Sequence, residues 1–443
     1  MFDKILIANR GEIAVRVIRA AREMGVRTVA VYSEADRDAL HTQLADEAVC
    51  VGPAKPADSY LNMPNIISAA VLTGSPAIHP GFGFLSENSV FASMCAECGI
   101  KFIGPGAETI DLLGNKIHAK ELMLRSGVPV VPGSAAAAGV SSAAAEAERI
   151  GFPVMLKAAA GGGGRGIRIA RSGGEVESLA EAVSKEGRLF FGDGSFYVEK
   201  YIENPRHIEV QVLGDEYGNI IHLGERNCSI QRRHQKILEE TPCLSAELRE
   251  KLGAVAVSAA KAANYKNAGT VEFLMDWDDN FYFMEMNTRI QVEHPITEMV
   301  TGIDLVKRQI LIAAGEKNLS QGDVKFSGHA IECRINAECP DNAFAPSCGE
   351  IAFLLTPSGG LGLRVDSAIY QGLRISPHYD SMLAKVIVHG QTREDAVMKM
   401  RRALYEFVIE GVETNIDYQT EILNNEEFLS GKYDTGFLGR MKS

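Results

Sequence analysis

The residues best suited to chemistry lie in a predicted β-hairpin over residues 270–287, where two aromatic-rich segments flank a polar turn. Depending on which two of residues 278–280 form the loop, Glu272 lies opposite Glu285 or opposite Asn287. The neighbouring residues are mostly apolar, which favours burial over a solvated face with incidental acids. Two buried carboxylates repel each other unless a cation lies between them. The three oxygen donors therefore predict a Mg²⁺ site, with Mn²⁺ as an alternative ion.

Polar residues occupy every second position of the segment that follows the hairpin. These residues are Asn287, Arg289, Gln291 and Glu293. In an extended segment they share one face, which presents a guanidinium, two amides and a carboxylate together. Such a face can bind a small oxyanion and also carry a general base.

A glycine-rich segment precedes the hairpin, with five glycines among residues 161–166. The spacing formally satisfies a dinucleotide-binding pattern, but a Rossmann turn opens a helix, and residues 167–169 alternate like a strand. A strand, a glycine loop and a second strand instead predict a flap over phosphates, similar in logic to the glycine-rich loop of kinases. Lys157, on the first strand, can neutralise phosphate oxygens.

The run Phe-Met-Glu-Met-Asn-Thr-Arg-Ile-Gln-Val-Glu-His-Pro, residues 283–295, resembles the signature of biotin carboxylases within the ATP-grasp superfamily. The resemblance extends from residue 5 to about residue 420. It implies ATP- and Mg²⁺-dependent carboxylation of biotin that is carried on a separate protein. In this family bicarbonate attacks the γ-phosphoryl group of ATP to give carboxyphosphate, which collapses to CO₂ and phosphate. The ureido nitrogen of biotin is then carboxylated.

The resemblance also assigns roles by position. Glu293 is expected to deprotonate bicarbonate, and Arg334 to stabilise negative charge on the ureido oxygen. The four expected catalytic residues are Lys236, Arg289, Glu293 and Arg334. Bicarbonate is expected to contact Lys236, Arg289, Gln291, Val292 and Glu293, and the metal to contact Glu272, Glu285 and Asn287. The expected ATP contacts are Lys116, Lys157, Gly161, Gly162, Gly163, Gly164, Gly166, Glu199, Lys200, Ile202, His207, Gln231, His234, Leu274 and Glu285.

A glycine-containing turn over residues 79–87 resembles the loop with which biotin carboxylases approach the biotin ring. Phe82 stands where the family usually has tyrosine, and the backbone of Gly83 is expected to serve beside Arg334. The implied partners are a biotin carboxyl carrier protein and carboxyltransferase subunits. The implied pathway is the first half-reaction of acetyl-CoA carboxylase in fatty acid synthesis, with a pyruvate or propionyl-CoA carboxylase as the alternative.

A homodimer is also implied, and the resemblance places Arg19, Glu23 and Arg364 in its interface. Without the resemblance, the first two residues would be read as an exposed ion pair one helical turn apart.

The elements that must position these residues predict a chain of α/β and α+β class. Short apolar strands alternate with helices over residues 1–106, which predicts a parallel sheet. We expect a Rossmann-like N-terminal domain at 1–113, an ATP-grasp domain at 114–327 with a mobile lid at about 132–203, and a mostly antiparallel C-terminal domain at 328–443. A single long helix is predicted over about 107–126.

Composition excludes several classes of protein. The 443 residues are 46% hydrophobic and 23% charged, as in ordinary globular proteins, and the net charge of −12 disfavours nonspecific nucleic-acid binding. The basic run at 226–236 lacks the interleaved aromatics of a base-stacking surface. We find no membrane-spanning run and no signal-peptide pattern, so the expected compartment is the cytoplasm. The eight scattered cysteines are expected to be free thiols.

Three other functions are alternatives to biotin carboxylation for this sequence. Another ATP-grasp ligase would share the nucleotide site but would not require the Arg289–Glu293 face. A silent regulatory subunit would have lost acids or lysines that are present here. An NAD-dependent oxidoreductase would need a glycine fingerprint in the first turn, residues 8–12, which is missing. Finally, Met-Lys-Met at 398–400 resembles a biotin attachment site, but helical spacing predicts that Lys399 lies on a helix surface.

Overall fold

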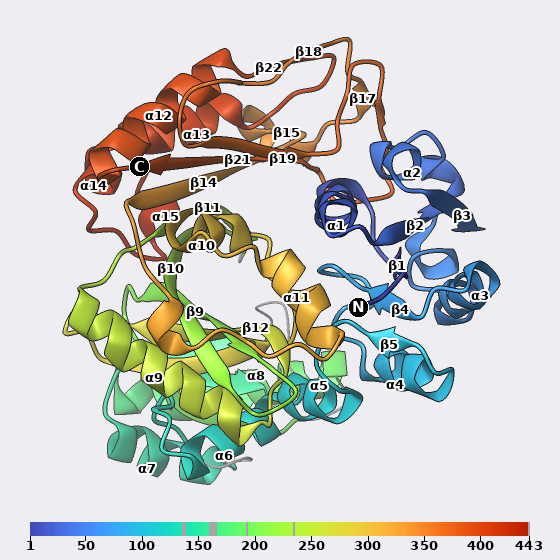
Figure 1. Ribbon diagram of the computed structural model, residues 1–443. Coiled ribbons are helices and arrows are strands. Elements are labelled where there is room, and N and C mark those ends of the chain that lie inside the picture. The colour runs from blue at the N-terminus through green and yellow to red at the C-terminus, as the bar shows by residue number, and fades with distance from the viewer. Residues whose placement is uncertain (135–138, 159–165, 192–193, 234, 442–443) are drawn as a thin grey trace. The chain divides into compact units, whose positions relative to one another are not determined.

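The computed structural model describes residues 1–134, 139–158, 166–191, 194–233 and 235–441 (Figure 1). The described chain forms two compact units. Unit 1 contains residues 1–119, 207–272 and 285–443, and unit 2 contains residues 120–206 and 273–284.

The first part of unit 1 is a five-stranded parallel sheet with strand order β3-β2-β1-β4-β5, as the alternation of strands and helices predicted. Its strands are β1 (Lys4–Ile7), β2 (Arg27–Ser33), β3 (Glu47–Gly52), β4 (Ala77–His79) and β5 (Lys101–Phe102). The helices around it are α1 (Gly11–Glu23), α2 (Leu40–Leu44), α3 (Met63–Thr73) and α4 (Ser89–Glu97) (Figure 1). The side chains of β1 are fully or almost fully buried, because a parallel sheet is covered on both faces.

An eight-stranded sheet has the order β13-β12-β9-β10-β11-β14-β21-β19. Its strands are β9 (Arg206–Gly214), β10 (Ile220–Arg232), β11 (Gln235–Thr241), β12 (Asn267–Met275), β13 (Phe281–Asn287), β14 (His329–Asn336), β19 (Leu363–Ser367) and β21 (Met382–Gly390). The registered pairs from β9 through β19 are all antiparallel. The domain boundary expected at residue 328 therefore falls between two strands of one sheet, β11 and β14.

Helices and short strands complete unit 1. The helices are α5 (Ala107–Gly114), α9 (Ala246–Ala262), α10 (His294–Thr301), α11 (Leu305–Ala313), α12 (Arg393–Glu406), α13 (Ile416–Asn424), α14 (Glu426–Leu429) and α15 (Phe437–Met441). The short strands are β15 (Glu338–Cys339), β16 (Ala345–Pro346), β17 (Gly349–Glu350), β18 (Phe353–Leu355), β20 (Arg374–Ile375) and β22 (Val408–Glu410). Lys399 lies within α12, where its ammonium donates to the carbonyl of His389, so the prediction of a helical lysine is confirmed.

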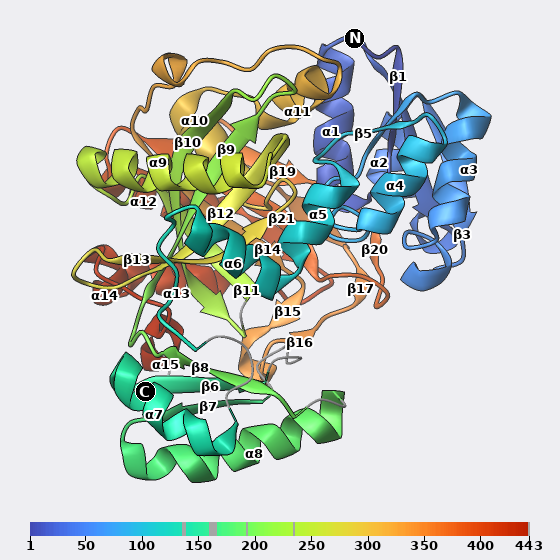
Figure 2. The same cartoon turned by 90° about the horizontal axis from the view of Figure 1, so that it is seen from below.

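Unit 2 contains a three-stranded antiparallel sheet of order β7-β6-β8, with α7 (Val140–Ile150) and α8 (Gly173–Phe191) packed against it (Figure 2). Its strands are β6 (Val154–Ala158), β7 (Ile167–Ala170) and β8 (Phe196–Lys200). Strands β6 and β7 pair directly, with Lys157 opposite Ile167. The two predicted strands and their pairing are therefore confirmed. The glycine loop between them, residues 159–165, lies outside the described part of the chain.

Two local predictions were wrong. The long helix expected over 107–126 is two helices, α5 and α6 (Lys116–Arg125), because Asn115 has an extended ψ of 106° and caps the second helix by accepting from the amide of His118. The hairpin loop contains three residues rather than two. The amide of Asp276 donates to the carbonyl of Asn280 at 2.9 Å, and Asp279 takes a left-handed φ of 60°.

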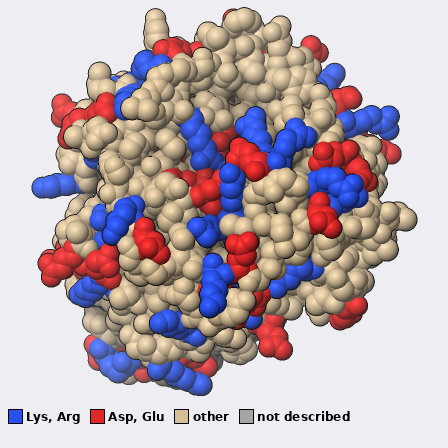
Figure 3. All heavy atoms as spheres, viewed as in Figure 1, with Lys and Arg blue, Asp and Glu red and all other residues tan. Residues whose placement is uncertain are grey.

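The described residues contain no helix that is both long enough and apolar enough to cross a bilayer. On the face drawn in Figure 3, basic side chains are interspersed with acidic ones.

Candidate active site

One buried lysine holds the centre of the site in unit 1. The Lys236 ammonium, on β11, contacts three carboxylates, those of Glu209, Glu272 at 3.1 Å and Glu293 at 2.6 Å. Burial alone would lower the pKa of Lys236, but the three acids raise it well above its usual value. The lysine is therefore cationic, and the acids around it exceed what one ammonium can neutralise.

Glu293 has no exposed surface, and two cations reach it from different strands. Lys236 donates to one oxygen, and Arg334 of β14 donates to the other at 2.9 Å. The thiol of Cys228 lies 3.8 Å from the first oxygen. Burial opposes ionisation, yet Lys236 and Arg334 hold the pKa of Glu293 well below its usual range. The predicted base and the predicted ureido-binding arginine are thus in direct contact.

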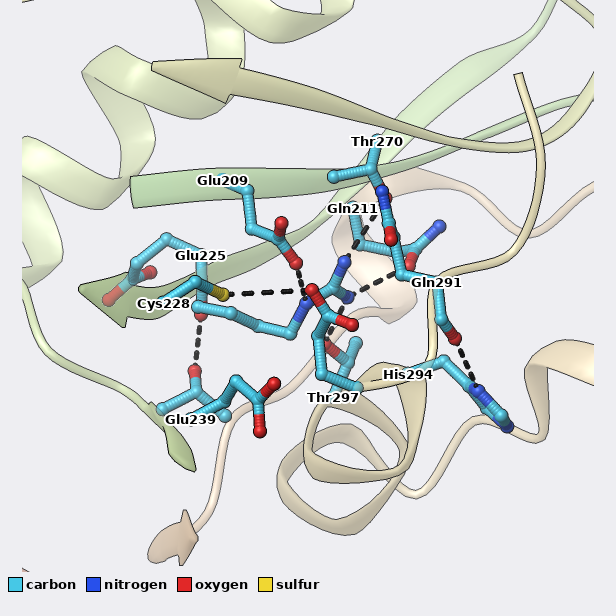
Figure 4. Close-up of polar contacts among 12 residues, drawn as sticks. Glu209, Gln211, Glu225, Cys228, Glu239, Thr270, Gln291, His294 and Thr297 are labelled. Carbon is cyan, nitrogen blue, oxygen red and sulfur yellow. Dashed lines mark hydrogen bonds and ion pairs between the residues drawn. The ribbon is translucent and has the colours of Figure 1, made fainter. Parts of the chain in front are cut away.

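A second buried cation contacts the same group of acids. Arg226 lies on β10, is fully buried, and donates to Glu209, Gln211, Thr270 and Thr297, four of the residues labelled in Figure 4. Sequence reasoning assigned no role to Arg226 or Glu209. A usable signal was present, because the polar members of His207-Ile-Glu209-Val-Gln211 alternate on one face of a strand.

The predicted metal ligands are only partly brought together. The Asn287 amide nitrogen donates to Glu272 at 2.7 Å, and His207 contacts the other oxygen of Glu272 at 2.8 Å. Glu285 instead pairs with Lys116 at 3.1 Å. The prediction that the loop sets Glu272 opposite one of these partners assumed a two-residue turn, and that basis was wrong. Lys236 and His207 overcome burial and lower the pKa of Glu272 below its usual range.

The segment after β13 does not form the single extended face that was predicted. It bends after Asn287, and Glu293 becomes the N-cap residue of α10. The bend is held by His294, whose amide and Nδ1 both contact the carbonyl of Gln291. Gln291 still reaches Glu272, at 3.4 Å, but the Arg289 guanidinium turns to Glu87 at 2.8 Å.

A cavity of about 660 Å³ in unit 1 brings the predicted biotin residues together. Phe82, Gly83, Arg289, Val292 and Arg334 all contribute to its wall. The turn that carries the first two residues is held by Asn9 of the β1–α1 connection, whose amide donates to the carbonyls of residues 80 and 82 at 2.7 Å. The wall of this cavity includes Arg334, which also contacts Glu293, so the cavity adjoins the carboxylate cluster.

Charge is distributed in the opposite way in unit 2. Glu199, on β8, accepts hydrogen bonds from Lys120 at 2.6 Å and from Lys157 at 2.9 Å. The two lysines lower the pKa of Glu199 although it is largely buried. Lys200 donates to the carbonyls of residues 151 and 152.

The other predicted nucleotide residues are placed as follows. Gly166 has a left-handed φ of 69° at the start of β7, and a side chain there would meet Ala158. Ile202 and Leu274 are partly buried in unit 2. Gln231 lines a cavity of about 220 Å³ with Tyr418 and Leu438 in unit 1. The remaining predicted contacts lie outside the described residues: Gly161, Gly162, Gly163, Gly164 and His234.

Two features of the chain, a hairpin with lysines in unit 2 and a large antiparallel sheet that carries buried carboxylates, are those of an ATP-dependent ligase of the ATP-grasp class. Three family models match the chain: biotin carboxylase, N-terminal domain, at residues 1–110; carbamoyl-phosphate synthase L chain, ATP binding domain, at 115–321; and biotin carboxylase C-terminal domain at 332–440. The chain is 58% identical to Biotin carboxylase 1 of Bacillus subtilis, over 99% of this chain and 98% of the relative. It belongs to the biotin carboxylase family, which confirms the resemblance and the predicted activity, ATP-dependent carboxylation of biotin.

Solved structures agree with this assignment. A complex of biotin carboxylase with β,γ-ATP from Campylobacter jejuni has a TM-score of 0.93 and 49% identity, with 99% of each chain covered. The biotin carboxylase domain dimer of the Hydrogenobacter thermophilus 2-oxoglutarate carboxylase, in complex with MgADP, ADP and bicarbonate, has a TM-score of 0.91 and 52% identity, with 99% of this chain and 98% of that chain covered. The predicted α/β and α+β fold class is therefore confirmed.

Proposed function

We propose that this chain uses ATP, Mg²⁺ and bicarbonate to carboxylate biotin presented by a separate carrier protein. The observation that carries the proposal is the position of Arg334, which lines the 660 Å³ cavity and donates to Glu293 at 2.9 Å. One cation therefore touches both the space offered to biotin and the carboxylate proposed as the base.

Bicarbonate activation requires a base that is ionised and held in place. Glu293 is ionised because of Lys236 and Arg334. An arriving bicarbonate anion would compete for the same two cations, which weakens their hold on the carboxylate and raises its basicity. Arg289, Gln291 and the backbone at Val292 would complete the anion site. Deprotonated bicarbonate can then attack the γ-phosphoryl group of ATP with ADP as the leaving group, and the resulting carboxyphosphate breaks its carbon–oxygen bond to give CO₂ and phosphate.

Biotin would enter the cavity with its ureido oxygen toward Arg334. The guanidinium donates to two carboxylates, those of Glu293 and of Glu239 on β11, so it can stabilise negative charge on that oxygen without first reorganising. Phe82 and Gly83 would form the wall beside the ring.

Mg²⁺ fits the residues present by donor type, because Glu272 and Glu285 offer carboxylate oxygens and Asn287, which contacts Glu272, offers an amide oxygen. We propose Glu272, Glu285 and Asn287 as its ligands. When bound, the ion neutralises charge on the phosphate oxygens of the nucleotide. The nucleotide itself would be bound by Lys116, Lys157, the loop at 161–166, Glu199, Lys200, Ile202, His207, Gln231, His234 and Leu274. Closure of residues 132–203 as a lid would keep water from the reactive phosphate.

We further propose that the chain acts with a biotin carboxyl carrier protein and carboxyltransferase subunits, with acetyl-CoA as the final acceptor and pyruvate or propionyl-CoA as alternatives. The domain boundaries at residues 113/114 and 327/328, the cytoplasmic location and the homodimer remain predictions. For the dimer, Arg19 is exposed, whereas Glu23 pairs with Lys307 and Arg364 pairs with Glu298 and Asp366 within the chain.

The decisive experiment measures ATP hydrolysis by the purified chain with Mg²⁺ and bicarbonate, with and without free biotin. We expect biotin to stimulate hydrolysis and Glu293→Ala to abolish that stimulation. Glu216→Ala is a suitable control, because Glu216 likewise accepts from two cationic side chains, those of Lys101 and Lys266, but is partly exposed and contacts no member of the Lys236 cluster. Hydrolysis that does not depend on bicarbonate would contradict the proposal.

A further inference from the structure

A second buried lysine lies beside the site, and the proposed mechanism gives it no role. Lys385, on β21, has no exposed surface. Burial of an ammonium costs several kcal/mol unless its partners compensate. Most folds avoid that cost by placing an apolar residue at such a position. The contacts of Lys385 therefore indicate what the fold gains from the charge.

The Lys385 ammonium connects three parts of unit 1. It donates to the carbonyl of Val292 at 2.8 Å and lies 3.0 Å from Glu12, in the first turn of α1. It also lies 5.9 Å from the centre of the Phe82 ring, within the range of a cation–π contact. In the sheet register, Lys385 is the direct partner of Arg334 on the neighbouring strand.

The contact with Val292 has a structural consequence for Glu293. Glu293 is the N-cap residue of α10, so the carbonyl of the residue before it takes no part in the hydrogen bonds of the helix. Lys385 supplies a partner for that carbonyl and thereby fixes the plane of the peptide bond between Val292 and Glu293. The direction in which the Glu293 side chain leaves the backbone depends on this plane.

We propose that Lys385 is a positioning residue for the bicarbonate site: it fixes the peptide that carries Glu293 and ties it to Phe82 on the cavity wall. This inference rests on the proposed role of Glu293. It assigns the buried charge to geometry rather than to stability. Lys385 becomes the third member of a set of cations in which Arg334 orients biotin and Lys236 orients the anion. A displacement of about 1 Å at a reacting group can lower a rate about a hundredfold, so such a contact is worth keeping.

The test separates position from stability. In the double variant Glu12→Gln/Lys385→Met the ion pair is replaced by neutral groups of similar size, a change that buried pairs often tolerate. We expect the thermal midpoint to stay near that of the wild type and the KM for MgATP to stay within about twofold. The ratio kcat/KM for bicarbonate should fall by about tenfold or more. A folded double variant with wild-type kcat/KM for bicarbonate would overturn the inference.

Lys399→Met is the matched control. Lys399 makes the same kinds of contact, to the carbonyl of His389 at 2.9 Å and to Asp395 at 3.0 Å, but on the surface of α12. It should leave kcat/KM for bicarbonate unchanged. An equal fall in both variants would mean that any lysine-to-carbonyl contact has this effect, and it would overturn the specific role of Lys385.

A third variant keeps the test valid if the double variant does not fold. Glu12→Gln/Lys385→Gln retains a neutral donor near the Val292 carbonyl, and we expect its kcat/KM for bicarbonate to fall less than the tenfold expected for Glu12→Gln/Lys385→Met. An equally large fall in the folded protein would count against the carbonyl contact. The wild type is assayed first: without biotin-stimulated hydrolysis the proposed function fails, whereas an active wild type with unaffected Lys385 variants removes only this inference.

Discussion

The two units hold buried charge in opposite proportions. In unit 1, one lysine, Lys236, receives three carboxylates. In unit 2, one carboxylate, Glu199, receives two lysines. In unit 1, Arg226 also pairs with Glu209 and Arg334 also pairs with Glu293, so the excess of acid exists only around Lys236 itself. In unit 2 the two lysines are about one-third exposed, so solvent compensates part of their charge.

The sign of the excess charge around Lys236 and around Glu199 indicates which charge a ligand must carry to bind there. Surplus carboxylate favours a divalent cation, and surplus ammonium favours phosphate. The cluster around Lys236 in unit 1 therefore suits a metal ion, and the cluster around Glu199 in unit 2 suits a phosphate group.

The largest expected effect comes from the acid-rich cluster. Glu293→Gln keeps the shape of the side chain and an acceptor for Lys236 but removes the proposed base. Biotin-dependent turnover should fall by about 10²–10⁴-fold, the usual contribution of general acid–base catalysis. Steady-state rates with saturating MgATP measure this change.

Glu209→Gln is its paired control, because Glu209 contacts the same lysine. Its loss leaves the buried Arg226 without its carboxylate, so we expect a lower thermal midpoint and a smaller fall in turnover. Equal kinetic losses in the two variants would show that total charge, rather than the base, determines the rate.

The lysine-rich cluster gives the next effect. Lys157→Met should raise the KM for ATP by about tenfold, which corresponds to the loss of roughly 1.4 kcal/mol of binding to phosphate. Lys120→Met should raise it less, although Lys120 lies at a similar distance from Glu199 and is equally exposed. Steady-state rates at varied ATP concentration give the KM of each variant and test this difference. If the two variants are indistinguishable, the surplus charge serves Glu199 and not the nucleotide.

The sequence predicted those features that depend on neighbouring residues in the chain. The parallel sheet and the pairing of β6 with β7 follow from local periodicity, and both are confirmed. The loop length was wrong because Asp276 accepts from the amides of residues 278 and 280 and so stabilises a three-residue turn. The role of Arg226 could not be predicted, since its four partners come from two strands, β9 and β12, and from helix α10, and they meet only through the register of the folded sheet.

Two adjacent acids on β11, Glu239 and Glu240, differ in the same way within a single strand: one contacts the active-site arginine and the other is neutralised by structural partners. Glu239 faces Arg334, which donates to it at 2.8 Å, and its second oxygen is buried without a hydrogen-bond partner. Its partner across the sheet is another buried acid, Glu332, and the charges of Glu293 and Lys236 also act on it. Burial, together with the negative charge of Glu293, raises the pKa of Glu239 to about 7 despite Arg334.

A pH dependence follows from this pKa. Above pH 7 Glu239 is ionised and holds Arg334; as the pH falls through about 7 it takes up a proton and that hold weakens. We expect kcat/KM for biotin to fall severalfold between pH 8 and pH 6. Glu239→Gln, which resembles the protonated form, should have a low value at pH 8 and a flatter profile. A profile that keeps the same slope in this variant would assign the titration to another group.

Glu240 should have the smallest effect on catalysis. It accepts from His329 at 2.8 Å, from Arg393 at 2.7 Å and from Tyr433, so its charge is satisfied within the fold. Burial opposes ionisation, but His329 and Arg393 lower the pKa of Glu240 to about 2. A depressed folded pKa stabilises the protein above the unfolded value near 4.5, and this stabilisation is lost as the pH falls from there to about 2.

Glu240→Gln should therefore leave turnover at pH 8 unchanged. Relative to the wild type, it should remove up to roughly 3 kcal/mol of the pH-dependent part of the free energy of unfolding over this acid range. Denaturant unfolding at pH 8, 4.5 and 3 measures the difference. The two neighbouring variants would then distinguish a buried charge that serves the fold from one that serves a ligand. Glu239→Gln should alter the kinetics, and Glu240→Gln should alter the stability in acid. If Glu240→Gln lowered turnover at pH 8 in a folded protein, Glu240 would also serve catalysis, and the distinction between structural and ligand-directed buried charge would be wrong for these two neighbouring residues.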